Sequence, residues 1–272
     1  MTARQGPSIQ CSTGPFWAFE LEDTLDRLAE SGFTEIELMV TRDPRTHEPD
    51  IPFRLATERG LEIRSIHGPF LVMTKLVWGI DPLEKVRRGV EMCLAVGAET
   101  FIVHPPFLWE RQFARWVTRE SEEFSVACGV RIVVETMYPK WVRDRRVGGY
   151  RWLTPAQLAT AAPHVALDTS HLVLARQDIF ESLDILAPKL VHVHLSNNAG
   201  DGRDGHLQLE EGVLPMGRFL AELKRRDYAH AVALELAVSR YLERPSGELV
   251  EMLRRNLEFV QDRLTRDTIL DE

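Results

Sequence analysis

The chain alternates short apolar runs, rich in Val, Ile and Leu, with longer amphipathic stretches. Apolar runs of this length, bounded by Gly, Pro or polar residues, predict buried strands. Eight such runs occur, at residues 8–13, 35–40, 61–67, 100–104, 130–135, 164–168, 190–195 and 230–236.

The stretches between these runs place apolar residues on one side of a helix, with a period near 3.6 residues. Their ends carry helix signals, because Asp81 and Thr154 each precede a proline, as a capping residue does at a helix start. Gly97 follows one stretch at a position where a left-handed cap is common. The predicted helices span residues 21–31, 51–59, 82–96, 110–127, 155–161, 178–187, 215–226 and 247–264.

Strict alternation of strands and helices predicts parallel strands that are joined by right-handed crossovers. Eight such units close into a barrel, a fold that typically takes about 250 residues. We therefore predict an α/β protein that forms a single (β/α)8 TIM barrel, with one domain over residues 1–272. The first strand is followed by Ser12-Thr-Gly-Pro, which is not a glycine-rich phosphate loop, so a dinucleotide-binding fold is not indicated.

The composition is that of a globular protein with a large core, since 44% of the residues are hydrophobic and 27% are charged. The cysteines are few and scattered, and the sequence has neither a membrane-spanning apolar run nor a signal-peptide pattern. We expect a cytoplasmic enzyme with no membrane partner. The net charge of −8 argues against a protein that grips a nucleic-acid backbone.

Ionisable or imidazole side chains stand at the C-terminal ends of the third to eighth predicted strands, one on each strand. In a TIM barrel these ends converge on the active site. Carboxylates buried there need a cation or a proton, and carboxylate with imidazole is a ligand set for divalent metals. Glu135 and Glu235 each close an apolar run and form the expected catalytic pair. The full set is His67, His104, Glu135, Asp168, His194 and Glu235.

Three more residues extend this set of metal ligands. His171 follows Asp168 by three positions, and Asp204-Gly-His206 lies in a polar loop. Together these side chains would supply a further metal position. The alternatives are a helix cap with a loop histidine for the first pair, and a flexible turn for the second.

Three other histidines also have two readings. His67 and His104 stand beside prolines, which could fix each imidazole as a ligand or could merely end its strand. His192 lies two residues before His194 and therefore on the same side of the strand. We expect His192 to lie one layer deeper and to support the site from behind.

The long loop after the fifth strand, residues 138–152, is rich in Trp, Tyr and Arg. Aromatic rings stack on sugar faces, and Arg binds phosphate or carboxylate groups. We expect the substrate to contact Trp141 of this loop, His171, Lys75 after the third strand, and Arg203 of the later polar loop. An ordinary solvated lid is the alternative for any one of the loop residues.

These motifs together resemble the xylose isomerase-like TIM-barrel superfamily, which contains sugar and sugar-phosphate isomerases and epimerases as well as endonuclease IV. The resemblance covers nearly the whole chain. Its specific part is the ordered set His67, His104, Glu135, Asp168-x-x-His171, His194, Asp204-x-His206 and Glu235.

The resemblance implies one of two uses for these residues. In the epimerase branch, residues that match Glu135, Asp168, His194 and Glu235 hold one divalent ion, Mn²⁺, Mg²⁺, Co²⁺ or Zn²⁺. The two glutamates there exchange a proton with the substrate carbon, and the residue that matches His171 contacts the substrate. In the endonuclease IV branch, the whole set holds up to three zinc ions, which hydrolyse a phosphodiester beside an abasic site.

We expect the first use, in a metal-dependent isomerase or epimerase of a sugar, polyol or sugar phosphate that works through an enediolate. The chain departs from the endonuclease branch at His104-Pro-Pro-Phe-Leu, where that branch has a Pro-Gly-Ser-His type of turn. A multinuclear zinc phosphoester hydrolase is the alternative, and a ligand-binding or dehydratase-like relative is a third reading. The expected partner is a small sugar or sugar phosphate and not a nucleic acid, and a homo-oligomer stays open.

Overall fold

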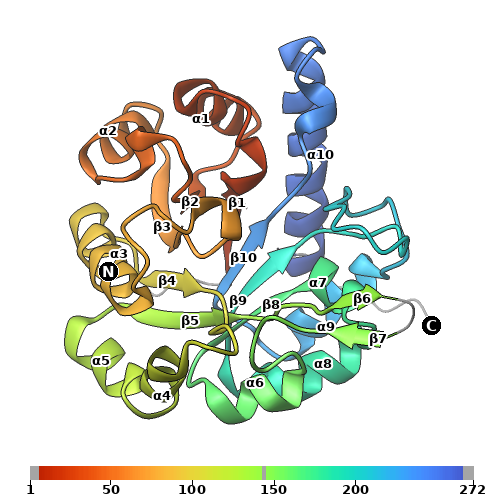
Figure 1. The fold of residues 1–272 in the computed structure, drawn as a ribbon. Helices are drawn as coiled ribbons and strands as arrows, with labels where there is room; N and C mark the ends of the chain where they lie inside the picture. Colours follow the sequence, from red (N-terminus) through yellow and green to blue (C-terminus); the bar gives the residue numbers. More distant parts are fainter. Residues whose placement is uncertain (1–5, 143–144, 266–272) are drawn as a thin grey trace.

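The computed structural model describes residues 6–142 and 145–265, and within them eight parallel strands close into a barrel (Figure 1). The predicted (β/α)8 TIM barrel is therefore confirmed. Around the barrel the strands follow one another as β1, β10, β9, β8, β5, β4, β3 and β2. Their bounds are β1 Ser8–Ser12, β2 Glu35–Met39, β3 Glu62–His67, β4 Thr100–Val103, β5 Arg131–Glu135, β8 Val165–Asp168, β9 Leu190–Leu195 and β10 Ala231–Leu234.

Helices surround the barrel and cover its outer face (Figure 1). Each buries its apolar side; in α1, for example, Leu21, Leu25 and Leu28 enter the core. Among the described residues, no helix combines the length and the apolarity that crossing a bilayer requires. The helices are α1 Leu21–Glu30, α2 Asp50–Glu58, α3 Pro82–Val96, α4 Arg111–Arg119, α5 Ser121–Cys128, α6 Pro155–Ala161, α7 Thr169–Leu174, α8 Ile179–Leu186, α9 Met216–Arg225 and α10 Ser246–Thr265, with short 3-10 turns η1 Gly14–Phe16, η2 Pro44–Thr46, η3 Val72–Thr74, η4 Ala187–Lys189 and η5 Ser239–Tyr241.

The helix ends carry the caps that the sequence predicts. A side-chain oxygen of Asp81 accepts the backbone N–H of Leu83 at 2.9 Å, at the start of α3. The hydroxyl of Thr154 caps α6 in the same way, and Gly97 ends α3 with a φ of 77°. These caps satisfy backbone groups that have no partner within the helix.

The register of the strands brings the ends that carry the polar residues to one level. Asp168 of β8 pairs with His194 of β9, and Glu135 of β5 pairs with Ala166 of β8. Below this level the barrel interior contains an apolar cluster of Ile102, Val133 and Ala166, all fully buried. Buried polar side chains, among them Gln10, Glu37, Ser65 and His192, share this interior and contact one another. The polar groups at the barrel end therefore lie above a packed interior that is partly apolar and partly polar.

Three segments differ from the sequence prediction. The stretch predicted as one helix over residues 110–127 forms two, α4 and α5, which meet at Glu120. The short helix α7 begins directly after β8, where we expected a loop. The loop after β5 contains an antiparallel hairpin of β6, Lys140–Val142, and β7, Arg145–Val147. The hairpin strands and α7 are too short for hydrophobic periodicity to detect.

Candidate functional site

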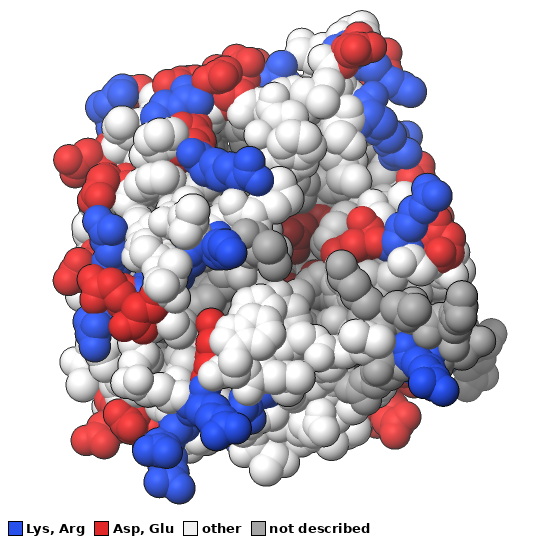
Figure 2. Space-filling model, viewed as in Figure 1, with Lys and Arg blue, Asp and Glu red and all other residues white. Residues whose placement is uncertain are grey.

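The predicted ligand residues stand at the C-terminal end of the barrel. In this region Figure 2 shows acidic side chains at the bottom of a central hollow. The positions match the prediction: His67, Glu135 and Asp168 end β3, β5 and β8, His104 and Glu235 directly follow β4 and β10, and His194 is the penultimate residue of β9.

Glu135, Asp168, His194 and Glu235 form a central group, with ligand atoms that all lie within 4.8 Å of one another. Nδ1 of His194 lies 2.7 Å from Oε1 of Glu135 and 3.6 Å from Oε2 of Glu235. Three of the four residues are buried, whereas the side chain of Glu235 is 13% exposed. Three carboxylates so close together repel one another unless a cation or protons balance them. The oxygen and nitrogen donors suit a divalent metal.

Asp168 divides its two carboxylate oxygens between the fold and the central group. Its Oδ1 accepts the backbone N–H of His171 at 2.8 Å and caps α7. Its Oδ2 is buried and has no hydrogen-bond partner among the described residues. Such an oxygen is costly to bury, and coordination to a cation would satisfy it. The central group therefore fits the divalent ion that the sequence predicts. Asp168 also caps a helix, which was the alternative role considered for it, so one side chain can serve both purposes.

Glu135 also belongs to a second group, with His67 and His104. Its Oε2 lies 3.4 Å from Nε2 of His67 and 3.3 Å from Nε2 of His104. All three residues are buried. One carboxylate thus faces the central group with Oε1 and the histidine pair with Oε2, an arrangement that could bridge two ions.

The loop after β9 brings Asp204 and His206 to His171, as predicted. Nε2 of His171 lies 3.3 Å from Oδ2 of Asp204, and Nε2 of His206 lies 3.2 Å from Oδ1. The ligand atoms of His171, His206 and Asp168 lie within 4.8 Å of one another. The hydroxyl of Ser170 donates to Asp204 at 2.9 Å, so side-chain contacts hold this turn against the site.

Glu37 of β2 supports His194 from inside the barrel. Its side chain is fully buried, and its carboxylate lies 3.2 Å from Nε2 of His194 and 3.0 Å from Nε2 of His192. His192 is also fully buried and occupies the deeper layer that we expected. The signal was a glutamate inside an apolar strand, where a carboxylate needs a partner.

Electrostatics tie the carboxylates and imidazoles of the central group together. Burial raises the pKa of Asp168 to about 6, and Glu135 and Glu235 contribute to this rise, while two histidines oppose it. Burial would lower the pKa of His194, but Glu37, Glu135 and Glu235 raise it well above its usual value. Burial would likewise raise the pKa of Glu135, but the neighbouring histidines hold it well below its usual value. Protons on imidazoles therefore balance the carboxylates, and a divalent ion would take over this role.

The four residues expected to contact the substrate do not all lie at the site. His171 lies in the site, and Lys75 is exposed and lines a pocket beside His104. The side chain of Arg203 is 87% exposed and lies 3.9 Å from Asp201, so the structure does not bring it to the ligand groups. Trp141 belongs to β6, and its side chain lies outside the described part of the chain. These four substrate contacts stay predictions.

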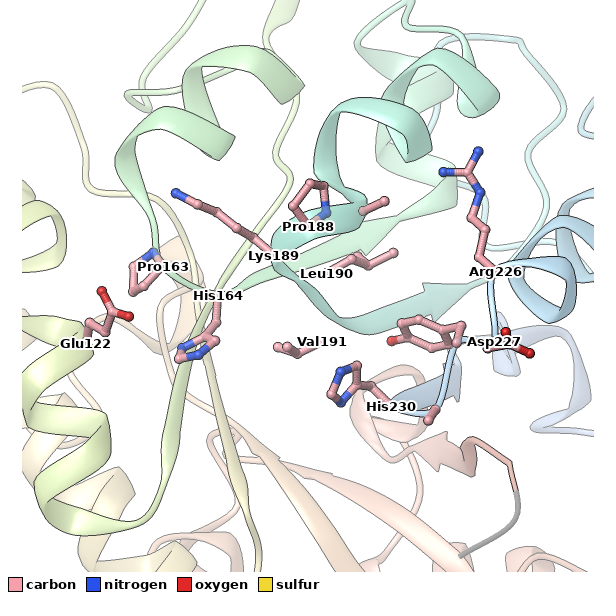
Figure 3. A pocket seen from close by; sticks show the side chains of 13 residues that line it. Glu122, Pro163, His164, Pro188, Lys189, Leu190, Val191, Arg226, Asp227 and His230 are labelled. Atoms are coloured by element: carbon pink, nitrogen blue, oxygen red, sulfur yellow. The ribbon is translucent and has the colours of Figure 1, made fainter.

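A depression of about 540 Å³ lies at the opposite end of the barrel, where β8 and β10 begin (Figure 3). His164 and His230 line it, but neighbouring cations already have partners. Lys189 donates to two backbone carbonyls at 2.5 and 2.9 Å, and Arg226 pairs with Glu222 at 2.7 Å. In TIM barrels this end serves stability, whereas active sites lie at the other end. We therefore assign the functional site to the end that holds the ligand groups.

Residues 25–259 match the family described as xylose isomerase-like TIM barrel, so the chain belongs to this family and the resemblance seen in the sequence is confirmed. An uncharacterized protein of Mycobacterium leprae (strain TN) is 30% identical over an alignment 276 positions long, and the alignment covers 95% of this chain and 98% of that relative.

Two solved structures illustrate the range of proteins with this fold. A D-tagatose 3-epimerase-like protein superposes with a TM-score of 0.68 and 21% identity, over 95% of this chain and 100% of that one. An AP endonuclease of family 2 from Brucella melitensis superposes with a TM-score of 0.65 and 15% identity, over 86% of this chain and 98% of that one. At these identities the similarity establishes the fold alone.

Proposed function

We propose that this protein is a divalent-metal-dependent isomerase or epimerase that acts on a sugar, a polyol or a sugar phosphate. The observation that carries this proposal is the convergence of Glu135 and Glu235 on one buried group with Asp168 and His194, with ligand atoms within 4.8 Å of one another. The similarity to a D-tagatose 3-epimerase-like protein supports the choice of a sugar.

When bound, the ion would polarise a substrate carbonyl and acidify the neighbouring C–H bond. The two glutamates would flank this carbon, and proton removal and return through an enediolate would move the carbonyl or invert the carbon. Glu135 is a weak base, because the histidines around it lower its pKa. Glu235 is the more accessible of the pair, so we assign it the first proton transfer and give Glu135 the return step.

The test is hydrogen exchange at carbon. The full chain is incubated in D₂O with a panel of aldoses, ketoses and their phosphates, in the presence of Mn²⁺, Mg²⁺, Co²⁺ or Zn²⁺. We expect deuterium to enter at the carbon beside the carbonyl, and a chelator to stop this exchange. A complete absence of exchange across the panel with all four metals would contradict the proposal.

A multinuclear zinc phosphoester hydrolase is the second candidate, because two further ligand groups adjoin the central one and share Glu135 and Asp168 with it. Metal content separates the two functions. Three zinc ions per chain, the loss of one in His206→Ala, and cleavage of a duplex with an abasic site would favour the hydrolase. One ion per chain without strand cleavage would favour the isomerase.

A further inference from the structure

A pocket of about 460 Å³ adjoins the ligand groups at the loops that follow β3 and β4. These strands are neighbours in the barrel (Figure 1), and His104 lines the pocket as well as facing Glu135. Small-molecule sites typically have volumes of about 300–1,000 Å³, so this pocket can hold part of a ligand. Its lining is mainly apolar and includes Phe70, Leu76, Ile80, Phe107, Trp109 and Tyr150.

Stacked aromatic rings form one wall of this pocket. The ring of Phe107 lies 4.5 Å from that of Tyr150 and 4.7 Å from that of Trp109, with interplanar angles of 17° and 5°. The ring of Tyr150 meets that of His104 edge-on at 6.0 Å. The aromatic wall therefore begins at a ligand histidine and extends outward from it. Flat rings in this arrangement favour a planar aromatic guest.

Two charged groups in the pocket wall, Lys85 and Glu110, already have partners within the protein, whereas Lys75 is exposed at its edge. Nζ of Lys85 donates to the carbonyl oxygen of Pro69 at 2.5 Å, and burial lowers its pKa to about 8. Oε2 of Glu110 accepts the backbone N–H of Phe107 at 2.8 Å. A hydroxylated sugar tail would lose its hydrogen bonds to water on entering, whereas an aryl group would lose none.

Large apolar side chains at the rim of the pocket are exposed to solvent. Leu76, Ile80 and Trp109 are 73%, 76% and 70% exposed, respectively. Large apolar side chains gathered around a concave site mark a surface that a ligand covers. The wall beside His104 thus continues into a rim that a bulky substituent would also contact.

We propose that this pocket binds an aromatic ring attached to the substrate, so that the preferred substrate is an aryl-substituted sugar or polyol rather than a free sugar. The sugar part of this inference rests on the proposed function, whereas the aryl site does not. The ring would lie between the Phe107 stack and the side chains of Leu76 and Ile80. The polyol would then extend past His104 toward Glu135 and Glu235.

The first test uses 2-naphthol, a probe that has a planar ring and no sugar. Its binding to the full chain is measured by titration calorimetry, with a chelator present and with Mg²⁺ present. We expect saturable binding in both conditions, and a loss of about tenfold in affinity in Trp109→Ala. The matched control is Trp17→Ala, which removes an equally exposed indole, 72% exposed, that does not line the pocket and should leave the affinity unchanged. An absence of binding, or equal affinity in Trp109→Ala and the wild type, overturns the aryl site.

The second test compares 6-O-benzyl-D-tagatose with 6-O-methyl-D-tagatose in the deuterium exchange assay. We expect kcat/KM to be at least tenfold higher for the benzyl ether, and this advantage to disappear in Trp109→Ala. Equal rates for the two ethers overturn the aryl preference. If 2-naphthol binds but neither ether exchanges deuterium, the proposed sugar isomerase or epimerase function fails, whereas the proposed aryl-binding site stands.

A second copy of this chain could also cover the apolar rim. Sedimentation of wild type and Trp109→Ala separates this case from a small ligand. We expect the same oligomeric state in both. Dissociation of an oligomer on loss of the indole would show that a protein surface occupies the pocket, and would overturn the proposal.

Discussion

Nδ1 of His194 and Oε1 of Glu135 lie 2.7 Å apart and connect β9 to β5 across the intervening strand β8. On its other side, the same imidazole meets Glu37 of β2 through Nε2, at 3.2 Å. Side chains from two other strands therefore fix this ring, one at each nitrogen. The geometry of the central group is set by the barrel itself, which limits the reorganisation that metal binding requires.

Replacing Glu135 with Gln should abolish most of the activity. The amide keeps the shape of the side chain but removes the charge that balances His194 and the group that exchanges a proton. We expect kcat to fall by about 10²–10⁴-fold, the usual size of acid–base contributions, with an unchanged far-ultraviolet circular dichroism spectrum. Glu123→Gln, at an exposed position, is the control and should retain full activity. Near-normal turnover in the Glu135 variant would contradict the proposed proton transfer by this residue.

Replacing Glu37 with Gln should weaken metal binding although this residue stands behind the ligands. Partners that orient a ligating histidine typically contribute about 10- to 100-fold in metal affinity. We expect a loss of that size by calorimetric titration with Zn²⁺, together with a lower kcat. Glu62→Gln, at a side chain that is 71% exposed, serves as the control. Unchanged affinity in the Glu37 variant would show that the barrel holds His194 without this carboxylate.

The metal-free protein should lose stability as the pH rises from about 6.5 to 9. Burial would lower the pKa of His206, but the neighbouring carboxylates of Asp204 and Glu235 raise it to about 9. A histidine with a raised pKa stabilises the fold below its unfolded pKa of about 6.5 and loses this contribution as the pH approaches the folded value. Burial lowers the pKa of His104, so this histidine does not contribute to the loss.

Thermal unfolding in the presence of a chelator checks whether stability falls as the pH rises. We expect the melting temperature to fall by several degrees between these pH values, since about 1 kcal/mol corresponds to roughly 2–4 °C for a chain of this size. Added Zn²⁺ should raise the melting temperature more at pH 9 than at pH 6.5, because protons no longer compete for the imidazoles. A greater increase at the lower pH would contradict the assigned protonation states.

Gly89 of α3 lies against the ring of Phe101 of β4, and a Cβ atom there would come within 2.1 Å of ring atoms. Gly89→Ala should therefore destabilise the protein by about 1–3 kcal/mol through overpacking. Gly247 of α10 has no atom within 4 Å of such a Cβ. Gly247→Ala should instead stabilise the fold by about 0.4–1 kcal/mol. Denaturant unfolding of both variants checks the two signs.

The sequence predicts the barrel because strands and helices alternate with clear periods, and it predicts the ligand positions because strand ends meet at one face. It leaves the partners of Glu37 open, since a glutamate two residues from a strand end can face the interior or the helices, and only the register decides which. It also misses the pocket beside His104. Phe70, Phe107 and Tyr150 come from different loops, and no local pattern brings them together.

The last strand, β10, carries Glu235 and pairs with both β1 and β9. A nascent chain that has emerged only through β9 and its loop already contains the other eight ligand residues, but its cylinder is still open. If these residues hold metal, as we propose, full coordination would have to wait until β10 has been made. On the proposed function, metal binding and the pairing of β10 with its neighbours would stabilise each other, so that a shortage of metal would first produce barrels with an unpaired β10 rather than unfolded chains.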